Sequence, residues 1–430
     1  MNICVIGTGY VGLVTGVCLA KAGHKVNCYD IDQGKINLLC KGVVPFYEPG
    51  LKELVMETLS SGTIEFTSDL LLAIEDCPLV IVAVGTPCRE NGEADISQVI
   101  AAVKDLACLL NSYKVIIIKS TVPVGTCTYI ENVIRQNMKN CCKIDVVSNP
   151  EFLREGSAIR DMLYADRIVI GSDSQEAIKV IKEAYIPFGR LIFETSRESA
   201  ELIKYASNAF LATKISFINE MASFCEKVGA DIKDVAKGMG FDPRIGFQFL
   251  KSGIGFGGSC FPKDLKGLIK AGEKIGYDFK IIKEALNVNE IQKIIPIQKL
   301  RNILGDLDGK TVALWGLSFK PDTDDIREAP SLDIIAALLN KGAAVKVFDP
   351  IAQDKVKDIF PQVISGQNCY DTVSGSHAVI LVTEWEEFKN VDFMKVKSLM
   401  AKPVIIDGRN LLDAQELKEM GFVYLGIGRK

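Results

Sequence analysis

The fold of this chain is decided by its first stretch, Asn2-Ile3-Cys4-Val5-Ile6-Gly7-Thr8-Gly9-Tyr10-Val11-Gly12. Residues 2–6 predict a buried strand, the glycines follow in the spacing G-x-G-x-x-G, and residues 13–22 predict a helix. A second strand is predicted at 25–29 and ends at Asp30, eighteen residues after Gly12. In this setting the glycines admit a pyrophosphate to the helix N-terminus, and the carboxylate accepts the ribose hydroxyls. The stretch therefore predicts a Rossmann-like domain that binds a dinucleotide.

The acidic end of the second strand indicates which dinucleotide binds. A carboxylate at Asp30 repels a 2′-phosphate, so we expect NAD rather than NADP. Lys35 is placed either to reach the same ribose or to sit in solvent. The residues expected to contact NAD in this part of the chain are Gly7, Gly9, Tyr10, Val11, Gly12, Asp30 and Lys35.

Two further apolar runs extend the predicted sheet. Residues 79–84 and 115–118 are almost continuously apolar, as in parallel strands that are buried on both faces. Each run ends in a polar loop, and these loops contain Thr86 and Thr121. Open α/β sheets bind ligands at the carboxyl ends of their strands, so both threonines are candidates for NAD contacts. Ordinary turn chemistry explains them equally well.

Residues 146–156 repeat the pattern of a strand that runs into a polar loop. Glu151 and Glu155 lie four residues apart in this loop. They could carry acid or base chemistry, or they could solvate the start of a helix. The sequence alone leaves both roles open.

A long helix is predicted from 197 to about 227, where no Gly or Pro occurs and apolar residues recur at helical spacing. Such a helix is longer than one domain needs, so we expect it to link two domains and to pack against a second subunit. Lys204 and Asn208 are four residues apart and share one face, near the apolar side. The alternative for this pair is a solvated lysine and asparagine.

The best candidate for covalent chemistry is the stretch Gly255-Phe256-Gly257-Gly258-Ser259-Cys260-Phe261-Pro262-Lys263-Asp264. Its three glycines let the backbone adopt positive φ and come close to a ligand. Lys263 and a helical pattern that starts near Asp264 both favour the thiolate form of the cysteine. We therefore interpret Cys260 as a nucleophile, although a free cysteine is usually a small buried core residue.

The pattern of the first domain returns beyond Gly309. Strands are predicted at 311–316, 345–349 and 378–382, but the G-x-G-x-x-G motif is replaced by Gly316-Leu317-Ser318-Phe319-Lys320. We infer a second doubly wound domain that binds a different, nucleotide-like ligand. The cations expected to meet its phosphates or those of the cofactor are Lys320, Arg327 and Arg409.

Together these patterns predict an α/β protein with two doubly wound Rossmann-like domains joined by a long central helix. The expected divisions are an NAD-binding domain at 1–196, a central helical and dimerisation region with the cysteine loop at 197–300, and a nucleotide-binding domain at 301–430. A homodimer is the smallest expected assembly.

Composition excludes several other classes of protein. With 430 residues and 48% hydrophobic residues the chain can bury two or three cores, and a net charge of -4 argues against nucleic acid as a partner. The thirteen cysteines form no C-x-x-C pair, and only two histidines occur, so we expect neither a metal site nor a disulfide framework. No apolar run reaches the length of about 20 residues that spans a bilayer. We expect a cytoplasmic protein that does not enter the membrane.

These motifs together resemble the nucleotide-sugar 6-dehydrogenases of the UDP-glucose/GDP-mannose dehydrogenase family, and the resemblance covers essentially the whole chain. It implies NAD-dependent four-electron oxidation of UDP-glucose at C6 to UDP-glucuronate, with two NADH released. The branch that acts on UDP-glucose is indicated by residues 155–161 and 165–171. The segments that carry the resemblance are 7–12, 120–123, 149–156, Lys204 with Asn208, 255–264, and 319–323 with Arg327.

The resemblance also implies roles for individual residues. Cys260 traps the aldehyde as a thiohemiacetal that becomes a thioester, Asp264 and Lys204 handle the alcohol proton through a bound water, and Asn208 with Lys204 stabilises the oxyanion. Glu151 assists thioester hydrolysis. Arg244 is expected to reach the neighbouring subunit. Further implied cofactor contacts are Glu155, Lys263 and Arg327, and the implied substrate contacts are Glu151, Phe152, Leu153, Arg154, Glu155, Lys204, Asn208, Arg244, Phe249, Leu250, Lys251, Ser252, Gly253, Gly257, Phe319, Lys320 and Arg409.

Three alternatives stay open at this point. The same chemistry could act on GDP-mannose or on a UDP-N-acetylhexosamine. A two-electron hydroxyacid dehydrogenase could use Lys204 and Asn208 alone and would form one NADH per substrate. A catalytically silent NAD-binding sensor would keep the nucleotide sites, since a fold alone does not determine a function.

Overall fold

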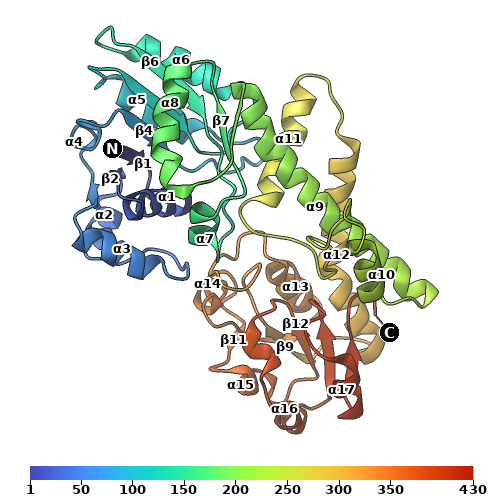
Figure 1. The fold of residues 1–430 in the computed structure, drawn as a ribbon. Helices are drawn as coiled ribbons and strands as arrows, with labels where there is room; N and C mark the ends of the chain where they lie inside the picture. The colour runs from blue at the N-terminus through green and yellow to red at the C-terminus, as the bar shows by residue number, and fades with distance from the viewer. Residues whose placement is uncertain (430) are drawn as a thin grey trace. The chain divides into compact units, whose positions relative to one another are not determined.

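The computed structural model describes residues 1–429, which fold into two compact units (Figure 1). The first unit contains residues 1–207 and 266–277, and the second contains residues 208–265 with those from 278 onward. The helix α9 (Arg197–Val228) confirms the long helix predicted from 197 to 227 and links the two Rossmann-like domains along the chain. The three divisions predicted from sequence stay a prediction.

The first unit is built on an eight-stranded sheet with strand order β3-β2-β1-β4-β5-β6-β7-β8. The strands pair in parallel except that β6 meets β7 antiparallel, through Ser148 and Gly171. The order reverses between β1 and β4, as in other dinucleotide-binding sheets. Its elements before α9 are β1 (Asn2–Ile6), α1 (Tyr10–Lys21), β2 (Lys25–Tyr29), α2 (Gln33–Leu39), α3 (Leu51–Ser60), β3 (Ile64–Thr67), α4 (Leu70–Ile74), β4 (Leu79–Val82), α5 (Ser97–Ala107), β5 (Lys114–Ile118), α6 (Thr126–Asn137), β6 (Ile144–Ser148), α7 (Ala158–Leu163), β7 (Ile168–Gly171), α8 (Gln175–Tyr185), η1 (Ile186–Phe188) and β8 (Ile192–Thr195).

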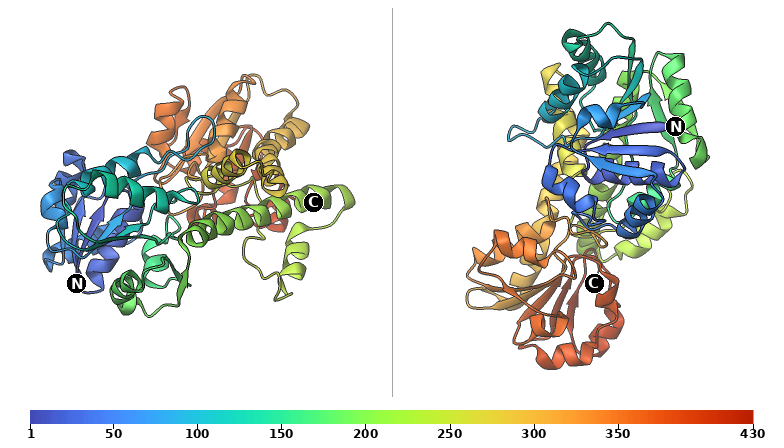
Figure 2. Two further views of the ribbon diagram at one scale, coloured as in Figure 1. Left: turned by 90° about the horizontal axis from the view of Figure 1, so that it is seen from above. Right: turned by 90° about the vertical axis from the view of Figure 1, so that its left-hand side faces the viewer.

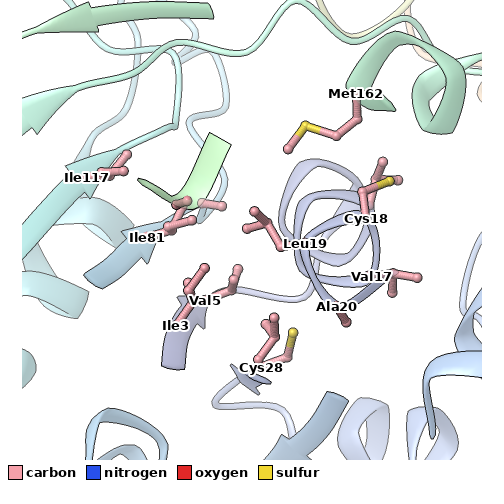
Figure 3. Close-up of a cluster of buried hydrophobic side chains, with 14 of the residues drawn as sticks. Ile3, Val5, Val17, Cys18, Leu19, Ala20, Cys28, Ile81, Ile117 and Met162 are labelled. Carbon is pink, nitrogen blue, oxygen red and sulfur yellow. The ribbon is translucent and has the colours of Figure 1, made fainter. Parts of the chain in front are cut away.

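Helices cover both faces of this sheet (Figure 2), and alternate residues of each central strand pack into two different cores. Ile3 and Val5 of β1 pack with α1, whereas Cys4 and Ile6 pack with α5 and α6. Figure 3 shows Leu19 of α1 facing the sheet in the first of these cores. Burial on both faces explains why these strands are apolar without alternation, as predicted.

The second unit is built on a six-stranded parallel sheet with strand order β11-β10-β9-β12-β13-β14. This sheet confirms the predicted second doubly wound domain. Its elements are β9 (Thr311–Trp315), α13 (Pro330–Leu339), β10 (Ala344–Phe348), α14 (Gln353–Ile359), β11 (Ile364–Ser365), α15 (Cys369–Val373), β12 (Ala378–Leu381), η2 (Glu386–Lys389), α16 (Phe393–Leu399), β13 (Val404–Asp407), α17 (Ala414–Glu419) and β14 (Val423–Leu425).

Three more helices lie between α9 and the second sheet in the sequence. They are α10 (Ile232–Gly240), α11 (Phe261–Lys274) and α12 (Lys280–Leu304). The glycine-rich stretch lies after α10: residues 255–260 are in the loop before α11, and residues 261–264 form the first turn of α11. Among residues 1–429, none of the helices combines the length and the apolar character that a membrane crossing requires.

The loop after the first strand has the same design in both units. Gly7 follows β1 with φ of 97°, and Gly316 follows β9 with φ of 88°. In both units an aspartate at the end of the second strand accepts a hydrogen bond from this loop: Thr8 N to Asp30 Oδ2 at 2.8 Å, and Leu317 N to Asp349 Oδ2 at 2.7 Å. The two units are therefore alike both in the glycine after the first strand and in the aspartate, Asp30 or Asp349, that binds the loop.

Candidate active site

The loop between β1 and α1 has the geometry that a dinucleotide needs. A Cβ atom at Gly12 would lie 1.9 Å from the carbonyl oxygen of Gly7, so only glycine fits at this turn. A Cβ at Gly9 would meet no atom within 4 Å, so the chain leaves open space beside that residue. The loop ends at the first turn of α1, where free backbone N–H groups can bind an anion. The residues present therefore fit the pyrophosphate of a dinucleotide.

Asp30 is buried at the end of β2 and keeps acceptor capacity for a ribose. Its Oδ2 accepts the backbone N–H and the hydroxyl of Thr8, and it pairs with Lys35 Nζ at 2.9 Å. Its Oδ1 accepts only the backbone N–H of Asp32, at 3.0 Å, among these contacts. Burial alone would raise the pKa of Asp30, but Lys35 and the N–H donors bring it below its ordinary value. The carboxylate is thus charged at neutral pH, and Lys35 lies beside it rather than in open solvent.

Tyr10 is tied to the loop after β6 by a glutamate that sequence reasoning missed. Its hydroxyl donates to Glu48 Oε2, and the same carboxylate accepts N–H groups from Gly156 at 2.6 Å and from Ala158 at 2.7 Å. Glu48 is 5% exposed. Burial, Glu48 and Glu155 together raise the pKa of Tyr10 well above its ordinary value, so the phenol stays protonated. The expected NAD loop and the loop of Glu155 are therefore held together.

Glu151 and Lys204 form a buried ion pair in the first unit. Lys204 Nζ lies 2.8 Å from Glu151 Oε1, and the two residues are 3% and 6% exposed. The backbone N–H of Leu153 donates to the other carboxylate oxygen. Burial would raise the pKa of Glu151, but Lys204, this N–H and Lys119 lower it below the ordinary value. Glu151 is therefore a carboxylate at neutral pH and can act as a base.

Burial argues against the solvent-exposed alternative for Glu151, Glu155 and Lys204, and their acid or base roles stay predictions. Glu151 and Glu155 are 6% and 9% exposed and precede α7 in a loop, so they do not solvate a helix start. Lys204 is buried against the ring of Phe152, with Nζ 5.5 Å from the ring centroid, and Arg167 stacks on the same ring. Phe152 thus joins the predicted group around Lys204.

A second buried group lies in the second unit. Asn208 Nδ2 donates to Asp264 Oδ2 at 2.6 Å, and Lys263 Nζ pairs with Asp264 Oδ1 at 2.6 Å. Asp264 is 1% exposed and Asn208 is 7% exposed, so Asn208 is not a solvated residue. Lys204 and Asn208 stand one turn apart on α9, as the spacing predicts.

Cys260 directly precedes α11, so its thiol lies at the N-terminal end of a 14-residue helix. The backbone N–H of Asp264 bonds to the carbonyl of Cys260 at 2.9 Å, which places the cysteine at the helix start. Its side chain is partly exposed, with Sγ 3.6 Å from the hydroxyl of Ser259. A helix N-terminus stabilises a thiolate. This position is chemically suited to a nucleophile.

The glycines before Cys260 make room for the protein's own atoms. A Cβ at Gly257 would lie 2.1 Å from the carbonyl oxygen of Glu328, and one at Gly258 would lie 2.7 Å from the ring of Phe319. A Cβ at Gly255 would lie 2.6 Å from Asn289 Oδ1. The expected close approach at these positions is therefore an approach to other parts of the chain. A ligand contact by Gly257 stays a prediction.

Asn289 of α12 and Arg409 hold this glycine stretch in place. The Asn289 side chain accepts the N–H of Phe256 at 2.8 Å and donates to its carbonyl at 3.0 Å. Arg409 donates to the carbonyl of Gly255 at 2.9 Å and to that of Val382 at 2.8 Å. Arg409 therefore binds the backbone at the start of the glycine stretch, and its predicted contact with phosphates stays a prediction.

Three of the other predicted ligand contacts are arginines that pair with neighbouring aspartates. Arg154 pairs with Asp161, Arg244 with Asp242 and Arg327 with Asp325, and each arginine side chain is more than 60% exposed. Phe249 has φ of 64°, a strained value for a residue with a side chain. Leu250, Ser252 and Gly253 are buried, and Thr86 is 9% exposed. Lys251 and Thr121 are at least partly exposed. Lys320 lies over the ring of Phe319.

Sequence reasoning missed three buried polar residues that organise these groups: Glu48, Lys119 and Asn289. Lys119 could have been identified from the sequence. It directly follows the apolar run 115–118, and a charged side chain at the end of a buried strand is unfavourable unless it is paired. Glu48 and Asn289 could not have been identified from residue spacing, because Glu48 binds Gly156, 108 residues away, and Asn289 binds Phe256, 33 residues away.

Comparison with known proteins covers the whole chain. Three models of the UDP-glucose/GDP-mannose dehydrogenase family match it: the NAD binding domain at residues 1–189, the central domain at 198–291 and the UDP binding domain at 313–414. The UDP-glucose 6-dehydrogenase TuaD of Bacillus subtilis is 49% identical over 429 residues, which cover 100% of this chain and 93% of that protein. The UDP-glucose 6-dehydrogenase of Pseudomonas aeruginosa is 44% identical over 442 residues, with coverage of 100% and 98%.

A solved structure gives the same result in three dimensions. The UDP-glucose dehydrogenase of the archaeon Pyrobaculum islandicum superposes with a TM-score of 0.94 at 35% identity, and the match covers 100% of this chain and 98% of that one. The three family models cover most of the two sheets and most of the helical region between them, while β8 and β14 lie outside the matched ranges.

Proposed function

Because this chain belongs to the UDP-glucose/GDP-mannose dehydrogenase family, we propose that it oxidises the C6 alcohol of UDP-glucose to the carboxylate of UDP-glucuronate. NAD is the electron acceptor, and its binding domain is residues 1–189. The balanced reaction is UDP-glucose with two NAD and one water, giving UDP-glucuronate, two NADH and three protons. The observation that carries the four-electron form of the reaction is Cys260 at the start of α11, because a nucleophile is needed to keep the aldehyde bound.

The first oxidation removes the hydroxyl proton and a hydride from C6. Bound NAD accepts a hydride in each of the two oxidations. The C6 hydroxyl proton passes to a water molecule that Asp264 and Lys204 hold in this proposal. Asn208 and Lys204 donate to the oxygen as it gains negative charge, since they lie on one face of α9. Such donors are worth several kcal/mol in a site without bulk water, on the order of 3 kcal/mol each.

The second oxidation proceeds on the sulfur of Cys260. The thiolate adds to the aldehyde carbon, the new C–S bond gives a thiohemiacetal, and its oxygen takes up a proton. Loss of that proton and of the remaining C6 hydride gives the thioester. The N-terminus of α11 supports the thiolate before it attacks.

Hydrolysis of the thioester restores the enzyme. A water molecule adds to the carbonyl carbon while its proton passes to the Glu151 carboxylate. The C–S bond then breaks, Cys260 leaves as thiolate, and the sugar carries a carboxylate. The buried, ionised state of Glu151 supports this role as a base.

A homodimer is part of the proposal, and an exposed apolar stripe on α9 supports it. Phe210, Phe217 and Phe224 recur every seven residues and are 66%, 44% and 57% exposed, and Val228 is 58% exposed. A seven-residue apolar repeat is the pattern by which two helices pack side by side. Arg244, 87% exposed at its side chain, is proposed to reach the partner's substrate.

A substrate panel tests the proposed function. UDP-glucose, GDP-mannose, UDP-N-acetylglucosamine and UDP-N-acetylmannosamine are each offered with NAD, and NADH is counted against the sugar acid formed. The proposal expects two NADH per UDP-glucuronate and the highest kcat/KM for UDP-glucose. One NADH per substrate would instead identify a two-electron dehydrogenase. An inert protein that binds NAD would be a sensor.

A further inference from the structure

Lys119 is a buried lysine that is bonded to the loop of Glu151 and that the proposed reaction does not yet use. It follows the last residue of β5, and its backbone N–H bonds to the carbonyl of Val82 at 2.9 Å, so it continues the sheet. The residue is 4% exposed. Its Nζ donates to Asn149 Oδ1 at 3.1 Å and to the hydroxyl of Tyr185 at 3.4 Å. The ammonium is therefore fixed under the loop that carries Glu151.

Both of these acceptors are uncharged, although the donor carries a full charge. Asn149 and Tyr185 are 1% and 3% exposed, and they are bound to each other through Tyr185 Oη and Asn149 Oδ1 at 2.7 Å. The Asn149 amide also donates to the carbonyl of Val169 at 2.7 Å, which fixes the orientation of its oxygen. Burying an ammonium with only neutral acceptors is unfavourable unless an anion lies nearby. The nearby anion is Glu151, two residues after Asn149.

Glu151 is thus faced by two cations from different elements. Lys204 of α9 makes the direct ion pair at 2.8 Å. Lys119, at the end of β5, acts through space and lowers the pKa of the same carboxyl. The neutral N–H of Leu153 in its own loop also donates to Glu151, and Tyr185 of α8 contacts Lys119. The group of two lysines and one carboxylate carries a net positive charge.

We propose that Lys119 is a positioning residue that holds Glu151 as a carboxylate while Lys204 turns from Glu151 to the oxygen of the substrate. The inference rests on the proposed function. With Lys204 alone, each movement of its ammonium toward the substrate would leave Glu151 buried without a cation, and the carboxylate would take up a proton. A protonated Glu151 cannot accept the proton of the hydrolytic water. Lys119 does not move with Lys204, because Asn149 and Tyr185 hold its ammonium.

The test compares two buried lysines of one strand. Lys119→Met removes the charge and keeps the length of the side chain. Lys114→Met is the matched control, since Lys114 begins β5, is also 4% exposed, and donates to two carbonyl oxygens, those of Ile74 and Cys77, at 2.8 Å. Lys119→Arg keeps the charge. Thermal unfolding identifies the loss of stability that the two methionine variants share.

The first readout is thioester hydrolysis in a single turnover as a function of pH. Loss of Lys119 raises the pKa of Glu151, so the rate should fall at a higher pH than in the wild type as the pH is lowered. We expect Lys119→Met to lose up to about tenfold on the acid limb, at pH values below the Glu151 pKa of both proteins, and to approach the wild-type rate at neutral pH and above, which corresponds to an acid limb displaced by about one pH unit. Lys114→Met and Lys119→Arg should keep the wild-type profile. Equal profiles for Lys119→Met and the wild type, or equal displacement in Lys114→Met, would overturn the proposal.

The second readout does not depend on the reaction. Infrared difference spectra between each protein and its Glu151→Gln counterpart follow the carboxyl band of Glu151 during a pH titration. The ionisation midpoint should rise in Lys119→Met and stay in place in Lys114→Met. An unchanged midpoint refutes the role of Lys119 even if the substrate proves to be another sugar nucleotide. Failure of the substrate panel with a displaced midpoint would instead refute the proposed function alone.

Discussion

Replacing Gly257 by alanine is expected to displace the loop that carries Cys260, three residues further on. The added Cβ would lie 2.1 Å from the carbonyl oxygen of Glu328, 2.8 Å from its carbonyl carbon and 3.1 Å from Cα of Ala329. Real Cβ atoms essentially never approach another atom closer than 3.0 Å, so the backbone must separate by about 0.9 Å. The obstacle is backbone rather than the end of a flexible side chain, so no rotamer change relieves the clash. The loop must therefore move.

The size of the effect follows from that displacement. A shift of about 1 Å in a reacting group costs roughly 100-fold in rate. We therefore expect Gly257→Ala to lower kcat for NADH formation from UDP-glucose by about that factor, and the alkylation rate of Cys260 by iodoacetamide to change with it. NAD binding, followed by quenching of protein fluorescence, should stay near the wild-type value, because the expected NAD loop lies in the first unit.

The control is Gly238→Ala in α10. A Cβ there meets nothing within 4 Å, and alanine favours a helix over glycine by about 1 kcal/mol. This variant should keep full activity. The reasoning is refuted if Gly257→Ala also keeps its kcat within about threefold of the wild type, or if a crystal structure of the variant shows the loop from Gly255 to Cys260 in place.

Three further predictions test other parts of the site. Cys260→Ser should lose net four-electron turnover by at least about 1,000-fold and still bind NAD and UDP-glucose, because an alkoxide forms far less readily than a thiolate; oxidation of supplied UDP-glucose-6-aldehyde by Cys260→Ala near the wild-type rate would exclude the covalent mechanism. Asp30→Ala should raise the KM for NAD about tenfold and improve the use of NADP, since Lys35 then loses its carboxylate and can meet a 2′-phosphate; a wild type that prefers NADP would contradict the assignment. Phe217→Arg should dissociate the proposed dimer in sedimentation, and a wild type that is fully active as a monomer would contradict the interface.

The sequence predicted the elements whose signals are local. Strands at 2–6 and 25–29 and the helix from 197 follow from periodicity and from the absence of Gly and Pro, and the structure has them within one residue. Lys204 and Asn208 share a face because four residues are about one helical turn. Cys260 was identifiable because the glycines and Lys263 are its neighbours in sequence.

The contacts that organise the site were beyond such reasoning. Whether Lys204 pairs with Glu151 or lies in solvent depends on how a helix packs over a loop 53 residues earlier in the chain. The glycines of 255–258 illustrate the same limit, because their spacing predicts a close approach without indicating to what. The partner proved to be the chain itself, through Glu328, Phe319 and Asn289.

The second Rossmann-like domain explains why one chain can use this fold twice for different ligands. Asp349 corresponds in position to Asp30, but both of its oxygens are occupied: Oδ2 by the N–H groups of Leu317 and Ser318 and by Trp385 Nε1, and Oδ1 by two further backbone N–H groups. A carboxylate has about four acceptor positions, so Asp349 has none left for a ribose hydroxyl. Asp30 Oδ1, with one backbone donor, does. An aspartate at the end of the second strand can therefore bind a ribose in the first domain. In the second domain the corresponding aspartate only stabilises the loops around it, and a nucleotide has to be bound through other groups.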